Sequence, residues 1–262
     1  MTQGEKESQN IPEDHPRYQS LKYRHKIIDG MKDLIVAEAG LIAHGRGECF
    51  DYILGEKTNK SAKEAIDAAT ATLLLADYPV ISVNGNVAAL VPEYLVELSA
   101  TINAPLEINL FYRKEGRIEA IEHILKKAGA NNLLGTEESK MVELDNLSSN
   151  RRKVDPKGIK KGDVILVPLE DGDRTEKLKE FNKTVIAIDL NPLSRTSLRA
   201  DITIIDNVIR VLPKMIEIAK KFSDYSKNQL KKIIEQFDNE NNIKNSLDLM
   251  IDYLRNQKKQ IF

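Results

Sequence analysis

The stretch LIAHGRGECFDYILGE places three side chains that can do chemistry between glycines, directly after an apolar run. His44, Arg46 and Glu48 are groups that bind phosphates or move protons. Gly45 and Gly47 would let the backbone approach a ligand, because glycine has no Cβ and tolerates positive φ. The plainer alternatives are a tight connection for HGRG and a satisfied loop residue for the histidine. This stretch alone therefore does not decide a function.

The composition argues against several classes of partner. The chain has 262 residues, and its 39 lysines and arginines nearly balance 40 aspartates and glutamates. Such a balance gives no net attraction to nucleic acid or to an anionic membrane. No run approaches the ~18 apolar residues of a membrane span, and the polar N-terminus has no leader-like pattern. We expect a cytoplasmic protein with no nucleic-acid and no membrane partner.

Cysteine and histidine are too few for the usual structural metal sites. Cys49 is the single cysteine, which excludes an intramolecular disulfide, and we expect it to pack as a small hydrophobic residue. The four histidines are scattered, so a structural zinc site is not expected. The chain also has no GxxxxGK[ST] loop and no GxGxxG after its first strand, which removes the common NTPase and NAD signatures.

The elements that must position these residues alternate along the chain. Short, β-branched, apolar runs typical of strands covered on both faces lie at 79–84, 106–111, 163–169, 184–190 and 202–206. Helical patterns lie around them, at about 16–36, from 60 onward with Ser61 and Glu64 as a capping box, at 115–130 and at 173–182. This order predicts an α/β fold whose mainly parallel sheet is covered by helices on both faces.

We expect residues 1–262 to form a single α/β domain, since there is no tandem repeat and no low-complexity linker. Residues 1–10 are predicted to be a mobile tail, and 226–262 a helical C-terminal extension. The least regular segment, 138–162, is predicted to be a loop or lid.

Polar or glycine-containing sequences follow all five predicted strands. Ligands of open parallel sheets bind beyond the carboxyl ends of the strands, so these residues are expected to share one site. Taken singly, each has a structural explanation: turns for Asn-Gly and Asp-Gly, N-caps for Asp189 and Asp206, and solvated surface charges for Arg113 and Arg174. The set contains Asn84, Gly85, Asn86, Tyr112, Arg113, Glu170, Asp171, Asp173, Arg174, Asp189, Asn191, Arg195, Asp206 and Asn207.

This inventory fits a nucleotide and an anionic substrate. Arginine forks and helix N-termini suit phosphates and carboxylates, whereas the acids suit Mg²⁺, an amine or a ribose. A few charged hydrogen bonds of roughly 1.5–3 kcal/mol each could hold a phosphorylated ligand without a basic surface. The arginines concerned are Arg24, Arg46, Arg113, Arg174 and Arg195.

Several motifs resemble one known family. IPEDHPRYQSL, GLIAHGRGECFDYILGE, PVISVNGNVAALVP, EINLFYR, DVILVPLEDGDRTE, IAIDLNPLSRTS and ITIIDNVIR look like the archaeal phosphopantothenate synthetases, also called 4-phosphopantoate–beta-alanine ligases. The resemblance covers about residues 11–225, with a divergent segment at 130–155. It implies a Rossmann-like homodimeric enzyme of coenzyme A biosynthesis. The implied reaction joins 4-phosphopantoate to beta-alanine through an acyl-adenylate, using ATP and Mg²⁺ and releasing AMP and pyrophosphate.

The resemblance also implies roles for individual residues. The family's ATP-binding positions match Arg24, Arg46, Asp189, Leu190, Asn191, Arg195, Thr196, Asn207 and Val208. We place Asn84, Gly85, Asn86 and Arg113 near the acyl substrate. Candidate catalytic groups are Arg46, His44, Asp171 and Arg174, and candidate metal ligands are Glu48 and Asp173.

Two rival functions remain open from sequence. One is another nucleotide-dependent acid–amine ligase on the same fold, because the motifs indicate phosphates better than they indicate the acyl group. The other is a non-catalytic nucleotide sensor that signals through its C-terminal helices. The acids in EDGDR and HGRGE favour an enzyme, since a sensor needs no acids beside the phosphates.

Overall fold

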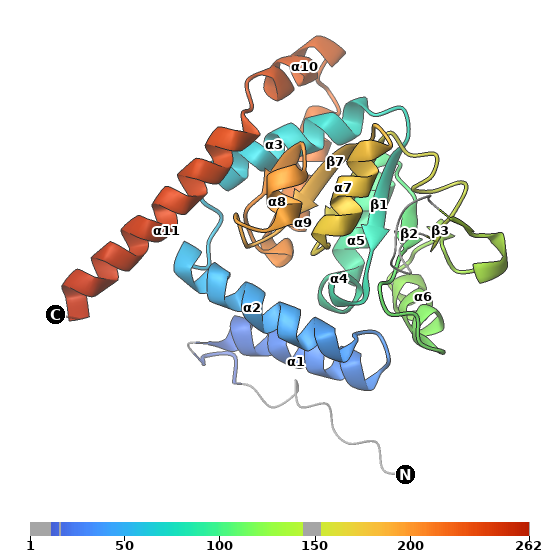
Figure 1. Cartoon of the computed structure of the whole chain (residues 1–262), viewed down its shortest axis with the longest axis horizontal. Helices are drawn as coiled ribbons and strands as arrows, with labels where there is room; N and C mark the ends of the chain where they lie inside the picture. The colour runs from blue at the N-terminus through green and yellow to red at the C-terminus, as the bar shows by residue number, and fades with distance from the viewer. Residues whose placement is uncertain (1–11, 16, 144–152, 262) are drawn as a thin grey trace.

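The computed structural model describes residues 12–15, 17–143 and 153–261 (Figure 1). The predicted mobile tail at 1–10 and part of the predicted lid, 144–152, lie outside the described residues. None of the described helices combines the length and apolarity needed to cross a membrane.

A six-stranded parallel sheet forms the centre, in the order β3-β2-β1-β6-β7-β8. Its strands are β1 (Pro79–Val83), β2 (Leu106–Ile108), β3 (Leu133–Leu134), β6 (Val164–Pro168), β7 (Thr184–Ile188) and β8 (Ile202–Ile204). All five predicted strands are confirmed, each ending before the polar residues that follow it. The chain order runs outward in both directions from the β1–β6 pair, which makes that pair the topological switch point.

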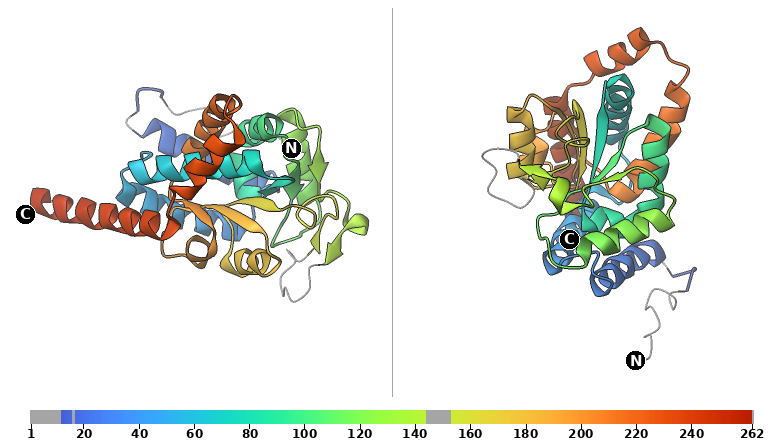
Figure 2. Two further views of the ribbon diagram at one scale, coloured as in Figure 1. Left: turned by 90° about the horizontal axis from the view of Figure 1, so that it is seen from above. Right: turned by 90° about the vertical axis from the view of Figure 1, so that its right-hand side faces the viewer.

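Helices cover both faces, as the alternation predicts, and Figure 2 shows them on either side of the sheet. One face packs on α3 (Lys60–Leu75), α5 (Pro92–Ile102), α6 (Arg117–Lys127) and α9 (Val208–Phe222), through inward residues such as Ile81 and Leu166. The other face packs on α7 (Gly172–Glu180) and on residues 154–159, through Val80 and Ile165. Side chains alternate between the two cores because successive strand residues point to opposite faces.

Two N-terminal helices lie across the carboxyl ends of the strands. These are α1 (Tyr18–Lys32) and α2 (Glu38–Leu54), which contact each other and the short helix α4 (Gly85–Leu90) after β1 (Figure 1). They close one side of the region where ligands of this fold class bind.

The C-terminal region is helical, as predicted. Helix α10 (Lys227–Glu235) packs on α3, and α11 (Asn239–Ile261) contacts α2, α3 and β8 before its last turns extend away from the body (Figures 1 and 2). The short helix α8 (Arg195–Arg199) connects β7 to β8.

The structure corrects several local predictions. HGRG is neither a loop nor a tight connection, because Gly45 and Gly47 lie inside the continuous helix α2. The N-cap of α3 is Asn59, whose side chain accepts from the Ala62 amide, so the predicted capping box at Ser61 is wrong. The segment 138–162 contains a 3-10 turn, η2 (Glu138–Lys140), and a small antiparallel pair, β4 (Val142–Glu143) and β5 (Lys153–Val154).

Candidate active site

A cavity of about 630 Å³ opens at the carboxyl ends of the strands. Its size suits a nucleotide together with a small acid. The lining includes many of the sequence-predicted residues, drawn from α2, the β1–α4 turn, the β6–α7 turn, the β7–α8 turn and the start of α9: His44, Arg46, Glu48, Asn84, Gly85, Asn86, Glu170, Asp171, Asp189, Leu190, Asn191, Arg195, Thr196 and Asn207.

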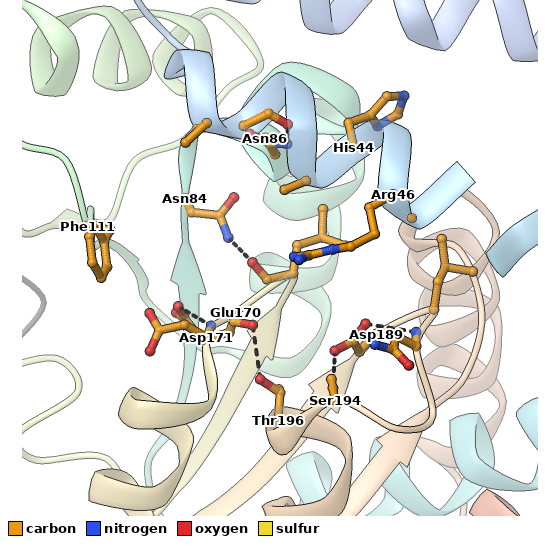
Figure 3. A pocket seen from close by; sticks show the side chains of 18 of the residues that line it. His44, Arg46, Asn84, Asn86, Phe111, Glu170, Asp171, Asp189, Ser194 and Thr196 are labelled. Carbon is orange, nitrogen blue, oxygen red and sulfur yellow. Dashed lines mark hydrogen bonds between the residues drawn. The ribbon is translucent and has the colours of Figure 1, made fainter. Parts of the chain in front are cut away.

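One end of the cavity, here called the β7–β8 end, is formed by residues 189–196 and Asn207. Asp189 organises the turn after β7: its carboxylate accepts from the Asn191 amide at 2.9 Å and from the Ser194 hydroxyl at 2.5 Å (Figure 3). Ser194, not Asp189, caps α8, so the N-cap alternative for Asp189 is wrong. Burial raises the pKa of Asp189, although Ser194 and Arg46 act in the opposite direction.

Asn207 closes the β7–β8 end and caps α9. Its amide group donates to the buried carboxylate of Asp51 at 2.7 Å. Arg210 bridges Asp51 and Asp206, which fixes the start of α9 against α2. Asp206 is therefore part of an ion-pair network, and Asn207 rather than Asp206 is the cap.

Asn84 joins the two strands at the topological switch point. Its Oδ1 caps α4 by accepting from the Val87 amide, and its Nδ2 donates to the carbonyls of Pro168 and Leu169 after β6 (2.9 and 3.1 Å). Gly85 cannot carry a side chain, because a Cβ there would lie 2.1 Å from the Ile35 carbonyl. Asn-Gly is therefore not a simple turn: it ties β1 to β6 beneath the cavity.

The turn after β6 brings two acids to the middle of the cavity. Asp171 caps α7 by accepting from the Arg174 amide, and Glu170 accepts from the Asp171 amide. The Glu170 carbonyl accepts from the Thr196 hydroxyl at 3.0 Å, which couples this turn to the β7–β8 end (Figure 3). Both carboxylates thus accept hydrogen bonds from backbone amides, which fix their positions in the turn.

Helix α2 supplies the groups on the opposite wall. Arg46 is exposed and extends into the cavity, without a hydrogen bond to any described residue (Figure 3). Glu48 pairs with Arg24 of α1 through both carboxylate oxygens (3.0 and 2.9 Å), and His44 Nε2 lies 4.0 Å from Glu48. Burial lowers the pKa of His44, which favours the neutral imidazole near pH 7.

Arg24, Arg113, Asp173, Arg174 and Val208 do not line the cavity. Arg174 is completely buried, donates to Asn109 and lies 3.5 Å from a Glu170 oxygen, so it supports the acidic turn from behind. Burial lowers its pKa to about 10. Asp173 pairs with the exposed side chain of Arg195 at 2.5 Å. Arg113 and Arg174 both have buried guanidinium nitrogens, so neither is the solvated surface charge that the sequence also allowed.

Sequence reasoning missed two charged residues beside the cavity. Arg117 lines it, at the wall formed by Leu110, Phe111 and Tyr112, which we call the β2 end. Glu107 lies fully buried behind that wall and accepts from the Asp155 and Ile159 amides at 3.1 and 2.6 Å. Burial raises the pKa of Glu107 to about 7. Glu107 sits within an apolar strand and Arg117 begins a helix, so no local motif marked either residue.

Within the described part of the chain, no three His, Cys, Asp or Glu residues converge as metal ligands. Mg²⁺ usually keeps several waters and takes one or two carboxylates together with substrate phosphates. The site therefore fits a cation that arrives with a nucleotide better than a resident one. Of the two predicted ligands, Glu48 is paired with Arg24 and Asp173 with Arg195.

Comparison with known proteins identifies the family of the chain. A family model described as phosphopantothenate/pantothenate synthetase matches residues 61–253. A 4-phosphopantoate–beta-alanine ligase of Thermococcus onnurineus is 56% identical over 230 residues, 87% of each chain. The protein of the same name from Thermococcus kodakarensis is 54% identical over 88% of each chain. The one from Methanosarcina mazei is 49% identical over 94% of this chain and 96% of its own. The chain belongs to the phosphopantothenate/pantothenate synthetase family.

Proposed function

We propose that this protein condenses 4-phosphopantoate with beta-alanine in the cytoplasm, using ATP and forming 4'-phosphopantothenate, AMP and pyrophosphate. The observation that carries the proposal is one cavity lined by Asp189, Asn191 and Asn207 at its β7–β8 end, by two acids at its middle and by Arg117 at its β2 end. The named relatives support the substrates. The reaction would be a step of coenzyme A biosynthesis.

ATP would occupy the β7–β8 end. Asp189 and Asn191 offer oxygens and an amide to the ribose or adenine, and Asn207 completes the cradle. Arg195 and Arg46 lie where they can reach the phosphates, and Arg24, Leu190, Thr196 and Val208 remain proposed nucleotide contacts. The support is that lining residues from the segments after β7 and after β8 meet at one end of the cavity.

The chemical step needs charge screening above all. A carboxylate oxygen of 4-phosphopantoate would attack the α-phosphorus of ATP, and pyrophosphate would leave. Both reactants are anions, so Arg46, which no described carboxylate pairs within hydrogen-bond distance, would stabilise the charge that builds on the phosphate. Bound Mg²⁺ would supply further screening of the phosphate oxygens.

The second step needs a neutral amine. Asp171 lies where it can attract the ammonium of beta-alanine. After the ammonium has lost a proton, the neutral amine would attack the acyl carbon and displace AMP. Because burial favours neutral His44, this imidazole can accept the proton that the ammonium loses. Arg174 would act as a positioning residue that holds Glu170 in place.

The partner that we propose is a second copy of the chain. Large apolar side chains stay exposed on the outer face of α2, where Ile42 is 74% and Tyr52 65% exposed. Single exposed apolar residues are ordinary, but two on one helix face favour a contact surface. Sedimentation equilibrium of the wild type and of I42E/Y52E tests this: we expect a dimer and a weakened dimer, and a monomeric wild type would refute it.

The decisive experiment is an assay with purified protein, ATP, Mg²⁺, 4-phosphopantoate and beta-alanine, followed by mass spectrometry. Joint appearance of AMP and 4'-phosphopantothenate would support the ligase and the adenylate. ADP in place of AMP would keep the ligase and replace the adenylate by an acyl phosphate. Activity only with another acid or amine in a panel would favour the rival ligase, and ATP binding without product would favour the sensor.

A further inference from the structure

A network of charged side chains joins α2 to the segment after β8. The Asp51 carboxylate of α2 accepts hydrogen bonds from Asn207 Nδ2 at 2.7 Å and from Arg210 at 2.5 and 3.2 Å. Arg210 also donates through Nε to Asp206 at 2.8 Å. Asp51 is 6% and Asp206 1% exposed, so both carboxylates are stabilised by these partners rather than by water.

Such a network contributes little to stability. Taking charges out of water costs free energy that their mutual attraction regains only in part, and well-packed apolar residues often stabilise as well. What a satisfied polar network does supply is one defined arrangement of the elements that it joins. Here it joins the helix that carries Arg46 to Asn207, which lines the cavity. The location of the network therefore points to a role in the site.

A second contact holds α2 on the other side of Arg46. Asn86 of α4 donates through Nδ2 to the Gly40 carbonyl at 2.8 Å. From Gly40 to Asp51 the helix rises about 16 Å at about 1.5 Å per residue, and Arg46 lies between the two contacts. One contact follows β1 and the other follows β8, so α2 is held at two points along the carboxyl edge of the sheet.

The position of the Arg46 guanidinium depends on how α2 is held. Its side chain extends into the cavity without a hydrogen bond to a described residue (Figure 3). Burial raises the pKa of Asp189 and the charge of Arg46 acts against it, so this charge reaches the β7–β8 end. A shift of about 1 Å in a group that stabilises a transition state can lower a rate by about 10²-fold. A small movement of α2 would therefore matter.

We infer that Asp51 and Arg210 are positioning residues for the reaction: they hold Arg46 in register with the nucleotide phosphates and touch neither substrate. Neither residue lines the cavity. The inference rests on the proposed function, in which Arg46 stabilises the charge on the reacting phosphate. Loss of Asp51 or Arg210 should then affect the step in which pyrophosphate leaves, and should do so only through Arg46.

The test is a double-mutant cycle of D51A and R46A in the full chain. We expect D51A to lower kcat by about 10-fold and to leave KM for beta-alanine unchanged, because we place the amine at Asp171. In the R46A background, D51A should cause no further fall. Exchange of labelled pyrophosphate into ATP with 4-phosphopantoate alone isolates the first step, and it should fall by the same factor as kcat. R210M should behave as D51A does, and R210K should restore part of kcat.

The matched control for lost stability is D163A. Asp163 accepts hydrogen bonds from the Asp77 and Tyr78 amides at 2.9 and 2.8 Å, at the amino ends of the strands and away from the cavity. D163A and D51A should both lower the thermal midpoint. Well below both midpoints, however, only D51A should lower kcat.

Folding is not expected to obscure the result, because Arg210 keeps Asp206 as an ion-pair partner in D51A. Three outcomes would overturn the inference and leave the ligase in place. These are effects of D51A and R46A on kcat that multiply in full, a fall in kcat for D163A equal to that for D51A, and wild-type kinetics in both D51A and R210M. If R46A binds ATP and turns over as the wild type does, the inference falls together with the proposed role of Arg46.

Calorimetric titration with ATP tests the same residues without turnover. D51A should bind ATP more weakly than the wild type, and D51A/R46A should bind it as R46A does. This result would support the inference even if the ligase assay gives no product. Equal binding of ATP by the wild type and D51A would refute it.

Discussion

The two ends of the cavity treat their polar groups in opposite ways. At the β7–β8 end, Asp189, Asn191 and Ser194 satisfy one another within a single turn, and Asn207 is tied to Asp51. At the β2 end, Arg113 and Arg117 are buried with unsatisfied nitrogens. The polar groups named at the first end have hydrogen-bond partners within the protein, whereas some guanidinium nitrogens at the second end have none among the described residues.

This difference separates two tasks. A turn whose donors and acceptors are already fixed needs little reorganisation to hold a nucleoside, so it contributes mainly to affinity. A wall with buried guanidinium groups favours one charge state of ligand over another, so it contributes mainly to selection. The residues of the two ends follow different strands, β7 and β8 at one end and β2 at the other.

The largest effect is expected from the group that lies between the two ends. R46A should lower kcat by about 10³-fold or more, because it removes the donor that we propose stabilises the reacting phosphate. The thermal midpoint should stay nearly unchanged, since Arg46 is exposed and has no hydrogen bond to a described residue. R195A should also abolish turnover without unfolding the protein. Wild-type kinetics in either variant would remove that arginine from the site.

Behind the β2 end, Glu107 should make stability depend on pH. Its folded pKa of about 7 exceeds the ordinary 4.5, so its stabilising contribution is present below about pH 4.5 and is lost as the pH rises to about 7. The contribution is about 3 kcal/mol. In E107Q, urea unfolding across about pH 4.5 to 8 should therefore show a flatter fall than in the wild type. An unchanged slope would mean that Glu107 is already ionised, and E180Q, an exposed change on α7, is the control.

At the β7–β8 end, D189A should cost stability and nucleotide affinity together. The variant loses the bonds to the Asn191 amide and the Ser194 hydroxyl, a loss of about 2 kcal/mol in the free energy of unfolding. KM for ATP should rise more than kcat falls, because we propose that this turn binds the nucleoside and does not contact the reacting atoms. D173A removes an exposed pair and should cost less than about 0.5 kcal/mol. If D189A leaves KM for ATP unchanged, the turn does not hold the nucleotide.

The smallest effects on stability and kinetics are expected from alanine substitutions at two glycines of α2. A Cβ at Gly45 meets no atom within 4 Å, so G45A should stabilise the protein by about 0.5–1 kcal/mol through helix propensity. A Cβ at Gly47 lies 3.4 Å from Leu190, at the β7–β8 end. We therefore expect G47A to gain less stability and to raise KM for ATP slightly, as measured by chemical denaturation and steady-state kinetics. Identical stability and KM for ATP in the two variants would show that a methyl group at position 47 does not disturb Leu190.

The sequence predicted the β7–β8 end better than the β2 end for a physical reason. Short polar residues after a strand make local hydrogen bonds, so Asp189, Asn191 and Asn207 can be recognised from their neighbours in the chain. The partners of Arg117 are carbonyls at Ile35 and Tyr112, and the first is far away in sequence. Such long-range contacts leave no periodic or motif signal.

Strands were predictable because runs such as 79–84 and 184–190 are apolar on both faces. The HGRG prediction was wrong because two glycines suggested a loop, whereas α2 is held by packing on α1, α4 and α11 that outweighs their poor helix propensity. Glu107 was missed for the opposite reason: an apolar strand pattern hid a carboxylate whose partners, Asp155 and Ile159, follow much later in the chain.

Helix α2 also carries the single thiol of the chain. Cys49 is exposed rather than packed, contrary to the sequence prediction, and it lies one turn after Arg46 on the face shared with Ile42 and Tyr52. A maleimide dye would therefore attach at one position per subunit without any engineered cysteine. Its emission would report ligand arrival at Arg46, and energy transfer between two dyes would report the approach of a second copy.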